Sequence, residues 1–244
     1  MFKVFSVAIG LAFIGLIAGC SSGDGGTNSN PDDTSEGVFC KLIVARSVTN
    51  MGVTLRLDTY EAVFDSSYGI CEPIEPIHNV DVSCEGEDLV WNATGEFYMY
   101  PEIPSPASPL ITLGGTYTFT VTAGNGVPAL TQSVVFPSDE PIMTTPAYNA
   151  TVTRSSGMQV EWTGSGSGMV EIMVMSMSGD VGHSVETAND GSHFISSEHM
   201  NKLPTGLSTV LLSHYNRTTF SETGYDSRSF KAGRIIHTQM ITLN

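Results

Sequence analysis

The chain contains residue types that could support catalysis, but their spacing predicts no catalytic site. In the run Gly164-Ser165-Gly166-Ser167-Gly168, no serine has glycine two places away on each side, as a nucleophile elbow requires. No lysine follows the last glycine, as a phosphate-binding loop requires. We therefore expect this run to be a hairpin loop.

Histidine is scattered along the chain without the paired spacing of a metal site. The six positions are His78, His183, His193, His199, His214 and His237. Glu198-His199 lacks the second histidine that a zinc-binding helix would supply. We predict no metal ion and no cofactor. A metal carrier or enzyme assembled from distant histidines and carboxylates remains an alternative.

One predicted strand carries methionines on one face and β-branched residues on the other. The methionines are Met169, Met173, Met175 and Met177, and the opposite residues are Val170, Ile172 and Val174. Thioethers suit copper(I), but alternate strand residues lie about 7 Å apart, so one ion would need ligands from a neighbouring strand. Adaptable apolar packing is the favoured interpretation. A strand that is apolar on both faces is central in its sheet or faces a partner.

Three cysteines lie in the part of the chain expected to fold. The expected directions of the first three strands place Cys40 and the loop that carries Cys71 at one end, and Cys84 at the other. We predict a disulfide between Cys40 and Cys71, worth about 3 kcal/mol through its effect on the unfolded state. A bond between Cys71 and Cys84 is the alternative.

A formal charge of −15 disfavours nucleic acid as a partner, because phosphates would be repelled. One segment is different, since it interleaves basic and aromatic residues that could bind an acidic glycan or another polyanion. Its members are Arg217, Phe220, Tyr225, Arg228, Phe230, Lys231 and Arg234. The favoured alternative is a long loop whose aromatic residues pack on a sandwich edge while its basic residues stay solvated.

The N-terminus carries the pattern of an export signal. Lys3 precedes an apolar run from Val4 to Ile17, which is shorter than the ~20 residues of a membrane-spanning helix. The run ends in Ile17-Ala18-Gly19-Cys20, which resembles the lipobox of bacterial lipoproteins. The resemblance implies that residues 1–19 are a signal peptide and that Cys20 is lipidated, so that the chain is anchored in a membrane. Ser21, in place of aspartate, implies the outer membrane.

Residues 20–37 are predicted to be a flexible tether, because they contain no large apolar side chain after the lipidated cysteine. The remaining chain is long enough for two domains. Prolines 137 and 141 flank the charged junction Ser138-Asp139-Glu140, which we expect to be exposed. The predicted domains are residues 38–138 and 139–244.

Alternating apolar and polar residues predict an all-β fold. The clearest strand is Thr116 to Thr122, in which Tyr117, Phe119 and Val121 alternate with threonines. Gly, Pro and Asn clusters separate further short strands at the intervals of a β-sandwich. One helical turn is expected at 197–202.

The turns and core positions also resemble known modules. Val80-Asp81-Val82-Ser83-Cys84-Glu85-Gly86-Glu87-Asp88-Leu89, with Gly115-Thr116-Tyr117-Thr118-Phe119-Thr120-Val121, is similar to immunoglobulin-like and transthyretin-like modules of bacterial surface lipoproteins. Thr145-Pro146-Ala147-Tyr148 with Val160-Glu161-Trp162 resembles a fibronectin-type-III-like or related module. The resemblance implies two tandem Ig-like β-sandwich domains and says little about function.

Together these patterns predict a lipid-anchored protein of the cell envelope that acts by binding, adhesion or scaffolding rather than by catalysis. The expected partner is an envelope protein or a glycan. A carbohydrate-binding accessory lipoprotein is the first alternative, in which Trp91 or Trp162 would contact sugar.

Overall fold

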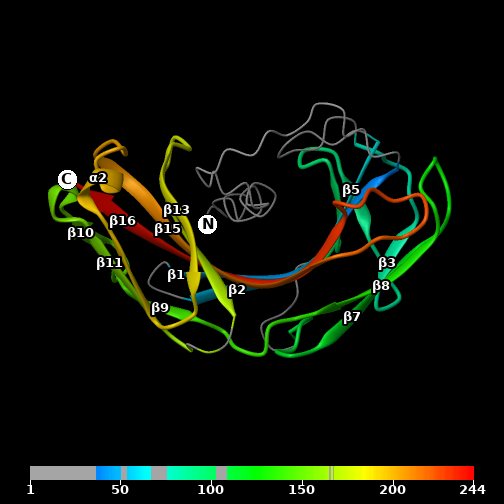
Figure 1. Ribbon diagram of the computed structural model, residues 1–244, viewed down its shortest axis with the longest axis horizontal. Coiled ribbons are helices and arrows are strands. Elements are labelled where there is room, and N and C mark those ends of the chain that lie inside the picture. The colour runs from blue at the N-terminus through cyan, green and yellow to red at the C-terminus, as the bar shows by residue number, and fades with distance from the viewer. Residues whose placement is uncertain (1–36, 51–53, 67–75, 103–108, 165, 167) are drawn as a thin grey trace, which may run out of the picture.

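The computed structural model describes residues 37–50, 54–66, 76–102, 109–164, 166 and 168–244. Within these ranges the chain is almost entirely β, with one 3₁₀ turn, η1 (Arg154–Ser156), and one short helix, α2 (Ser197–Met200). The strands form sheets of nine, four and three strands, and the sheets pack face to face (Figure 1). The predicted all-β sandwich fold is confirmed.

The nine-stranded sheet runs the length of the molecule. Its strands, in spatial order, are β13 (Val181–Ala188), β12 (Met169–Ser176), β15 (Gly206–Thr219), β16 (Phe230–Leu243), β1 (Phe39–Asn50), β2 (Thr54–Asp65), β6 (Phe97–Met99) and β5 (Val90–Asn92). A ninth strand, β10 (Ala150–Val152), pairs with the end of β16. The sheet is curved, so it has one concave and one convex face (Figure 1).

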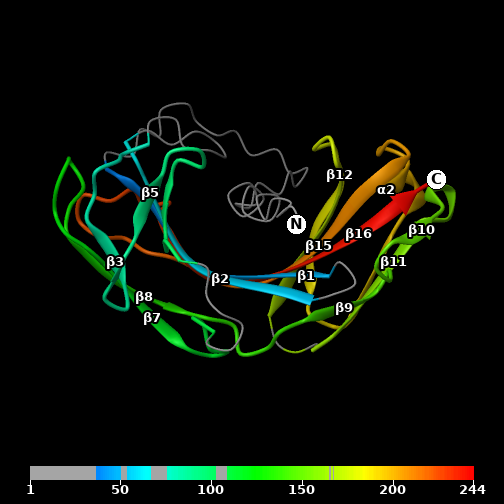
Figure 2. The ribbon, with the colours of Figure 1, turned by 180° about the vertical axis from the view of Figure 1, so that it is seen from behind.

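The two smaller sheets lie on the convex side, at opposite ends of the large sheet (Figure 2). One contains β4 (Glu87–Asp88), β3 (Val82–Cys84), β7 (Thr116–Val121) and β8 (Leu130–Val135). The other contains β14 (Ser192–Ile195), β11 (Met158–Thr163) and β9 (Ile142–Thr145). Each closes a separate sandwich with its end of the large sheet.

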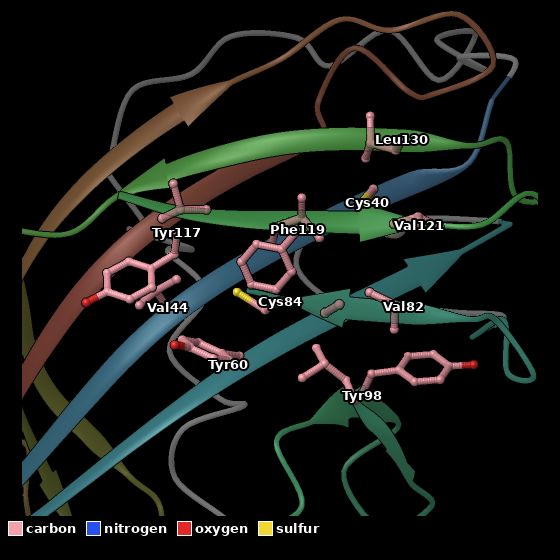
Figure 3. Packing of buried hydrophobic residues seen from close by; sticks show 14 of the residues in the cluster. Cys40, Val44, Tyr60, Val82, Cys84, Tyr98, Tyr117, Phe119, Val121 and Leu130 are labelled. Carbon is pink, nitrogen blue, oxygen red and sulfur yellow. The ribbon is translucent and has the colours of Figure 1, made fainter. Parts of the chain in front are cut away.

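The first core fills the space under the four-stranded sheet. Phe119 of β7 and Cys84 of β3 pack with Tyr60 and Phe64 of β2 (Figure 3). The second core lies under the three-stranded sheet, where Trp162 and Val160 meet apolar residues of the large sheet such as Leu212. Alternation along each strand explains both cores, because residues of one parity point inward.

The predicted boundary at residue 138 does not separate the two cores along the chain, because Phe220 and Tyr225 belong to the first core, and the large sheet contains strands from both predicted domains. β1 and β16 form a continuous parallel ladder from Lys41 opposite Phe230 to Asn50 opposite Gln239. The first core also includes Ile235 of β16. Independent folding of the two halves therefore remains a prediction that must account for this shared sheet.

The junction between the cores is not a solvated linker at Glu140, and this part of the expectation is wrong. The Glu140 side chain is only 10% exposed and pairs with Arg46 at 3.3 Å and with Arg56 at 2.8 Å. Arg46 also binds Asp58, with Nε 2.8 Å from Oδ1. Burial of a charge is tolerated when it is paired in this way.

The segment expected to be a long basic loop is a shorter loop flanked by two strands. β15 continues to Thr219 and β16 begins at Phe230, so only residues 220–229 connect them. Arg217 therefore lies on β15, and Phe230, Lys231 and Arg234 lie on β16. β13 was not expected from the sequence, because glycine, serine and acidic residues interrupt its apolar alternation.

Candidate functional site

The strongest candidate site is the concave face of the nine-stranded sheet. Strand alternation and register bring together side chains far apart in sequence: Tyr215 is opposite Arg234 across β15 and β16, and Ile43 is opposite Glu61 across β1 and β2. Residues of the other parity, such as Val44, point into the cores. The face therefore combines residues from both halves of the chain.

One end of the concave face is apolar and rich in methionine. Met173 and Met175 of β12 pack with Leu211 and Ile236 from the next two strands. This cluster continues into three residues that are about half exposed: Met177 at 47%, Val181 at 50% and Leu207 at 51%. We call these seven residues the methionine patch.

The backbone holds the exposed part of the methionine patch together. The Met177 amide donates to the carbonyl of Leu207 at 3.3 Å, and the Thr209 hydroxyl lies 3.8 Å from the Met177 sulfur. A register shift between Val174 and Met175 places Val181 opposite Met175. The expected placement of the methionines opposite Val170, Ile172 and Val174 is confirmed for Met173 and Met175, because the two sets belong to separate clusters. Glu171 shares the outer face with the methionines, so that face is not wholly apolar.

The centre of the concave face is charged and largely buried. Burial and, to a lesser degree, the nearby Arg234 together lower the pKa of Lys41 to about 8. Burial also raises the pKa of Glu61 and lowers that of Arg234, while the attraction between these two groups opposes both shifts. Glu171 lies further along the face, and burial raises its pKa as well.

The other end of the concave face is aromatic. The guanidinium carbon of Arg217 lies 4.0 Å from the centroid of the Phe230 ring, close enough for a cation–π interaction. Phe230 meets Phe39 edge to face, with ring centroids 6.2 Å apart. Arg217 is exposed, so this stack is open to a partner.

The predicted partner segment is divided by the fold. Arg217, Phe230 and Arg234 lie on the concave face. Phe220 and Tyr225 are buried in the first core, which confirms the packing alternative for these two residues. The seven residues therefore do not form one binding surface.

The two remaining basic residues of that segment are engaged elsewhere. Arg228 pairs with Asp226, with Nη2 2.6 Å from Oδ2. The Lys231 ammonium donates to the side-chain carbonyl of Gln132 at 2.8 Å, on the side of β16 that faces the four-stranded sheet. Neither contributes to the concave face.

The cysteines give no candidate reactive site within the described ranges. Cys40 and Cys84 are both free thiols buried in the first core, and burial raises the pKa of each. A buried thiol with a raised pKa is a poor nucleophile. Because Cys40 is a free thiol in the structure, the predicted disulfide between Cys40 and Cys71 is not supported. Cys71 and Cys20 lie outside the described residues, so lipidation of Cys20 remains a prediction.

The tryptophans proposed for sugar contact are not open platforms. Trp162 is only 4% exposed, and its indole N–H donates to Asn189 at 2.7 Å. Trp91 is partly buried and lies between His78 and Tyr98, with ring centroids 5.7 and 5.1 Å away. Both therefore serve mainly to pack the sandwich.

Three of the scattered histidines meet in space, which sequence spacing did not predict. His183, His193 and His199 come from β13, β14 and α2. In the parts of the chain that the structure describes, no three or more His, Cys, Asp or Glu side chains are arranged to hold a metal ion. Nor does any helix in those parts have the length and apolar character needed to cross a membrane.

Comparisons with known proteins do not assign a family. The sequence matches no protein-family model and no curated protein. Solved structures with some likeness include Dpr11 IG1 bound to DIP-gamma IG+IG2 and DIP-gamma IG1+IG2, each 7% identical with a TM-score of 0.19. Each match covers 84% of this chain, and 96% and 95% of the respective known chains. Likeness at this level carries no argument about function.

Proposed function

We propose that this protein is a lipid-anchored, non-catalytic binding module of the bacterial outer membrane that takes a protein partner on its concave face. The methionine patch is the observation that carries the proposal. It joins three half-exposed apolar residues, Met177, Val181 and Leu207, to a larger apolar cluster. Contiguous exposed apolar surface is typical of protein interaction sites.

The methionine patch lies on the face of β12 that is turned away from the second core. The inner face of β12 already supplies Val170, Ile172 and Val174 to the second core. Among the outer methionines of the patch, Met175 is buried and Met177 is 47% exposed, so Met177 offers apolar surface for association. Methionine is flexible and polarizable, and it is common on surfaces that adapt to a partner.

A protein partner fits the face better than a polyanionic glycan. The concave face balances Lys41, Arg217 and Arg234 against acidic side chains, two of which are Glu61 and Glu171. The balance leaves no strongly positive surface for a polyanion. Apolar contact beside mixed charges is the usual composition of a protein interface.

Site-specific photo-crosslinking in cells tests the proposed partner. A photoreactive phenylalanine analogue at Leu207 is expected to form a discrete adduct with an envelope protein. The same analogue at Val135, which is 53% exposed on the four-stranded sheet, is the matched control and is expected to form none. Met177→Asp should reduce the Leu207 adduct, because it places a charge in the patch.

Two outcomes would overturn the proposal. One is equal crosslinking from positions 207 and 135, which would indicate random encounters. The other is an adduct at Leu207 that is insensitive to Met177→Asp, because that result would separate crosslinking from apolar recognition.

A further inference from the structure

A cluster of three imidazoles closes one side of the second sandwich. The ring centroids of His183 and His199 are 4.7 Å apart, and those of His183 and His193 are 5.5 Å apart. Rings this close are in direct contact. Each histidine belongs to a different element, so the cluster links β13, α2 and β14.

The three histidines lie between the edges of two different sheets. β13 is at the edge of the nine-stranded sheet and β14 is at the edge of the three-stranded sheet. The two edges have no backbone ladder between them in the described chain, so the short link 189–191, side chains and α2 hold them together. Leu203, just after α2, packs close to Gly182 at the start of β13.

The surroundings of the cluster favour the uncharged form of the imidazole rings. The Nε2 atom of His183 is buried and has no hydrogen-bond partner among the described residues, so a proton there would add an unsolvated charge. His199 is anchored through its Nδ1, which lies 3.0 Å from the Ser196 hydroxyl oxygen. Protonating two neighbouring rings would place like charges in contact.

The charged groups around the cluster do little to offset that repulsion. Lys202 follows α2 and lowers the pKa of His183, in addition to burial and the two other histidines. Asp190 precedes β14 and opposes the lowering of the His193 pKa by burial. Glu198 is on α2, and Arg154 of η1 is bound to the Leu203 carbonyl at 2.6 Å.

We propose that His183, His193 and His199 form an acid-sensitive latch that joins β13, β14 and α2 and opens locally below neutral pH. The latch is independent of the proposed partner and of the membrane anchor. Acidification converts mutually packed neutral rings into cations that repel one another, and the edge strands separate along the cluster, where side chains and α2 join them in place of a backbone ladder.

The sign of the effect follows from proton linkage. Burial, with the neighbouring histidines, lowers the pKa of His183 to about 4, below its ordinary value of 6.5. The open form therefore binds more protons than the closed form between these values, and the closed form loses stability as the pH falls through that window. Because His183 is only half-buried, screening by water reduces the full effect. The local opening equilibrium is expected to rise on the order of ten-fold between pH 7.5 and pH 5.0.

Hydrogen exchange of the full chain, corrected for the intrinsic effect of pH on exchange, measures this opening. Amides of β13, β14 and α2 are expected to lose on the order of ten-fold protection at pH 5.0, while those of β7 and β8 keep theirs. His183→Gln should remove this difference. His78→Gln, outside the cluster, should retain it and is the matched control.

The proposal would be overturned if the protection of β13 amides from hydrogen exchange were independent of pH. It would also be overturned if the pH effect persisted in His183→Gln. A loss spread evenly over all three sheets would also overturn it, since groups such as the buried His237 would then be responsible. If His183→Gln prevents folding, His193→Gln tests the same repulsion with His183 intact, and an undiminished pH effect in that variant would overturn the latch.

Discussion

Removing Arg46 is expected to destabilise the whole protein, because its guanidinium joins strands β1 and β2 to the junction between the cores. Nε and Nη2 bind the two Asp58 oxygens at 2.8 and 3.0 Å. Nη2 also donates to the Ile111 carbonyl at 2.6 Å, and Nη1 donates to Glu140 at 3.3 Å. The Arg46, Asp58 and Glu140 side chains are 8%, 4% and 10% exposed. The Arg46→Met change keeps most of the volume but leaves two carboxylates buried without this partner.

The expected cost is about 3–5 kcal/mol, the usual result of breaking a buried ion pair from one side. That is a large part of the 5–15 kcal/mol by which a typical domain is stable. Arg56→Gln is the matched control: Arg56 binds the same Glu140 at 2.8 Å but is 53% exposed. Its loss should cost only about 0–1 kcal/mol, as for other exposed pairs.

Urea unfolding followed by circular dichroism measures the difference. With an m value of about 2 kcal/mol/M, Arg46→Met should lower the midpoint by about 1.5–2.5 M, and Arg56→Gln by less than about 0.5 M. Limited proteolysis should also cleave Arg46→Met faster at residues 138–140, because Glu140 is released. Equal midpoints for the two variants would refute the argument that burial makes the Arg46 interactions decisive.

Three further predictions concern covalent chemistry and the second core. Cys20→Ser should abolish labelling with palmitate and leave an unprocessed precursor, and persistent labelling would contradict lipidation there. Nonreducing peptide mapping should recover Cys40 as a free thiol, and a fragment that joins Cys40 to Cys71 would instead restore the disulfide expected from the sequence. Trp162→Ala should cost about 3–5 kcal/mol in chemical unfolding, because it leaves a cavity and takes away the donor to Asn189; a loss below about 1 kcal/mol would show that the site collapses to fill it.

Strand positions could be predicted from local alternation, since burial of one face leaves a period of two in the sequence. The threonine-rich strand β7 shows this well, with Tyr117, Phe119 and Val121 buried and their neighbours more exposed. The same alternation placed the outer methionines of β12 opposite the core residues. The strand β13 was not predicted, because Gly182, Ser184 and Glu186 interrupt the alternation of apolar and polar residues.

The pairing of strands that are far apart in the sequence could not be predicted from local patterns. The parallel ladder that pairs Lys41 with Phe230 joins residues almost two hundred positions apart, and nothing in either segment specifies its partner. For the same reason the three latch histidines read as scattered, since two of them lie on edge strands of different sheets. Contacts of this kind depend on which apolar faces remain to be covered once the hairpins have formed.

The shared sheet has a consequence for how a partner would be bound. The methionine patch is built on β12, β13, β15 and β16, whereas the charged centre also uses β1 and β2. The ladder between β1 and β16 therefore fixes the spacing between apolar and charged contacts, and on the opposite face Arg46 joins β1 to β2 through Asp58. A partner that contacts both regions would stabilise the junction of the two sandwiches along with the face itself, because it would bind only the form in which that ladder is intact. Separating the two halves at residue 139 should consequently abolish the Leu207 crosslink even if each half retains its own core.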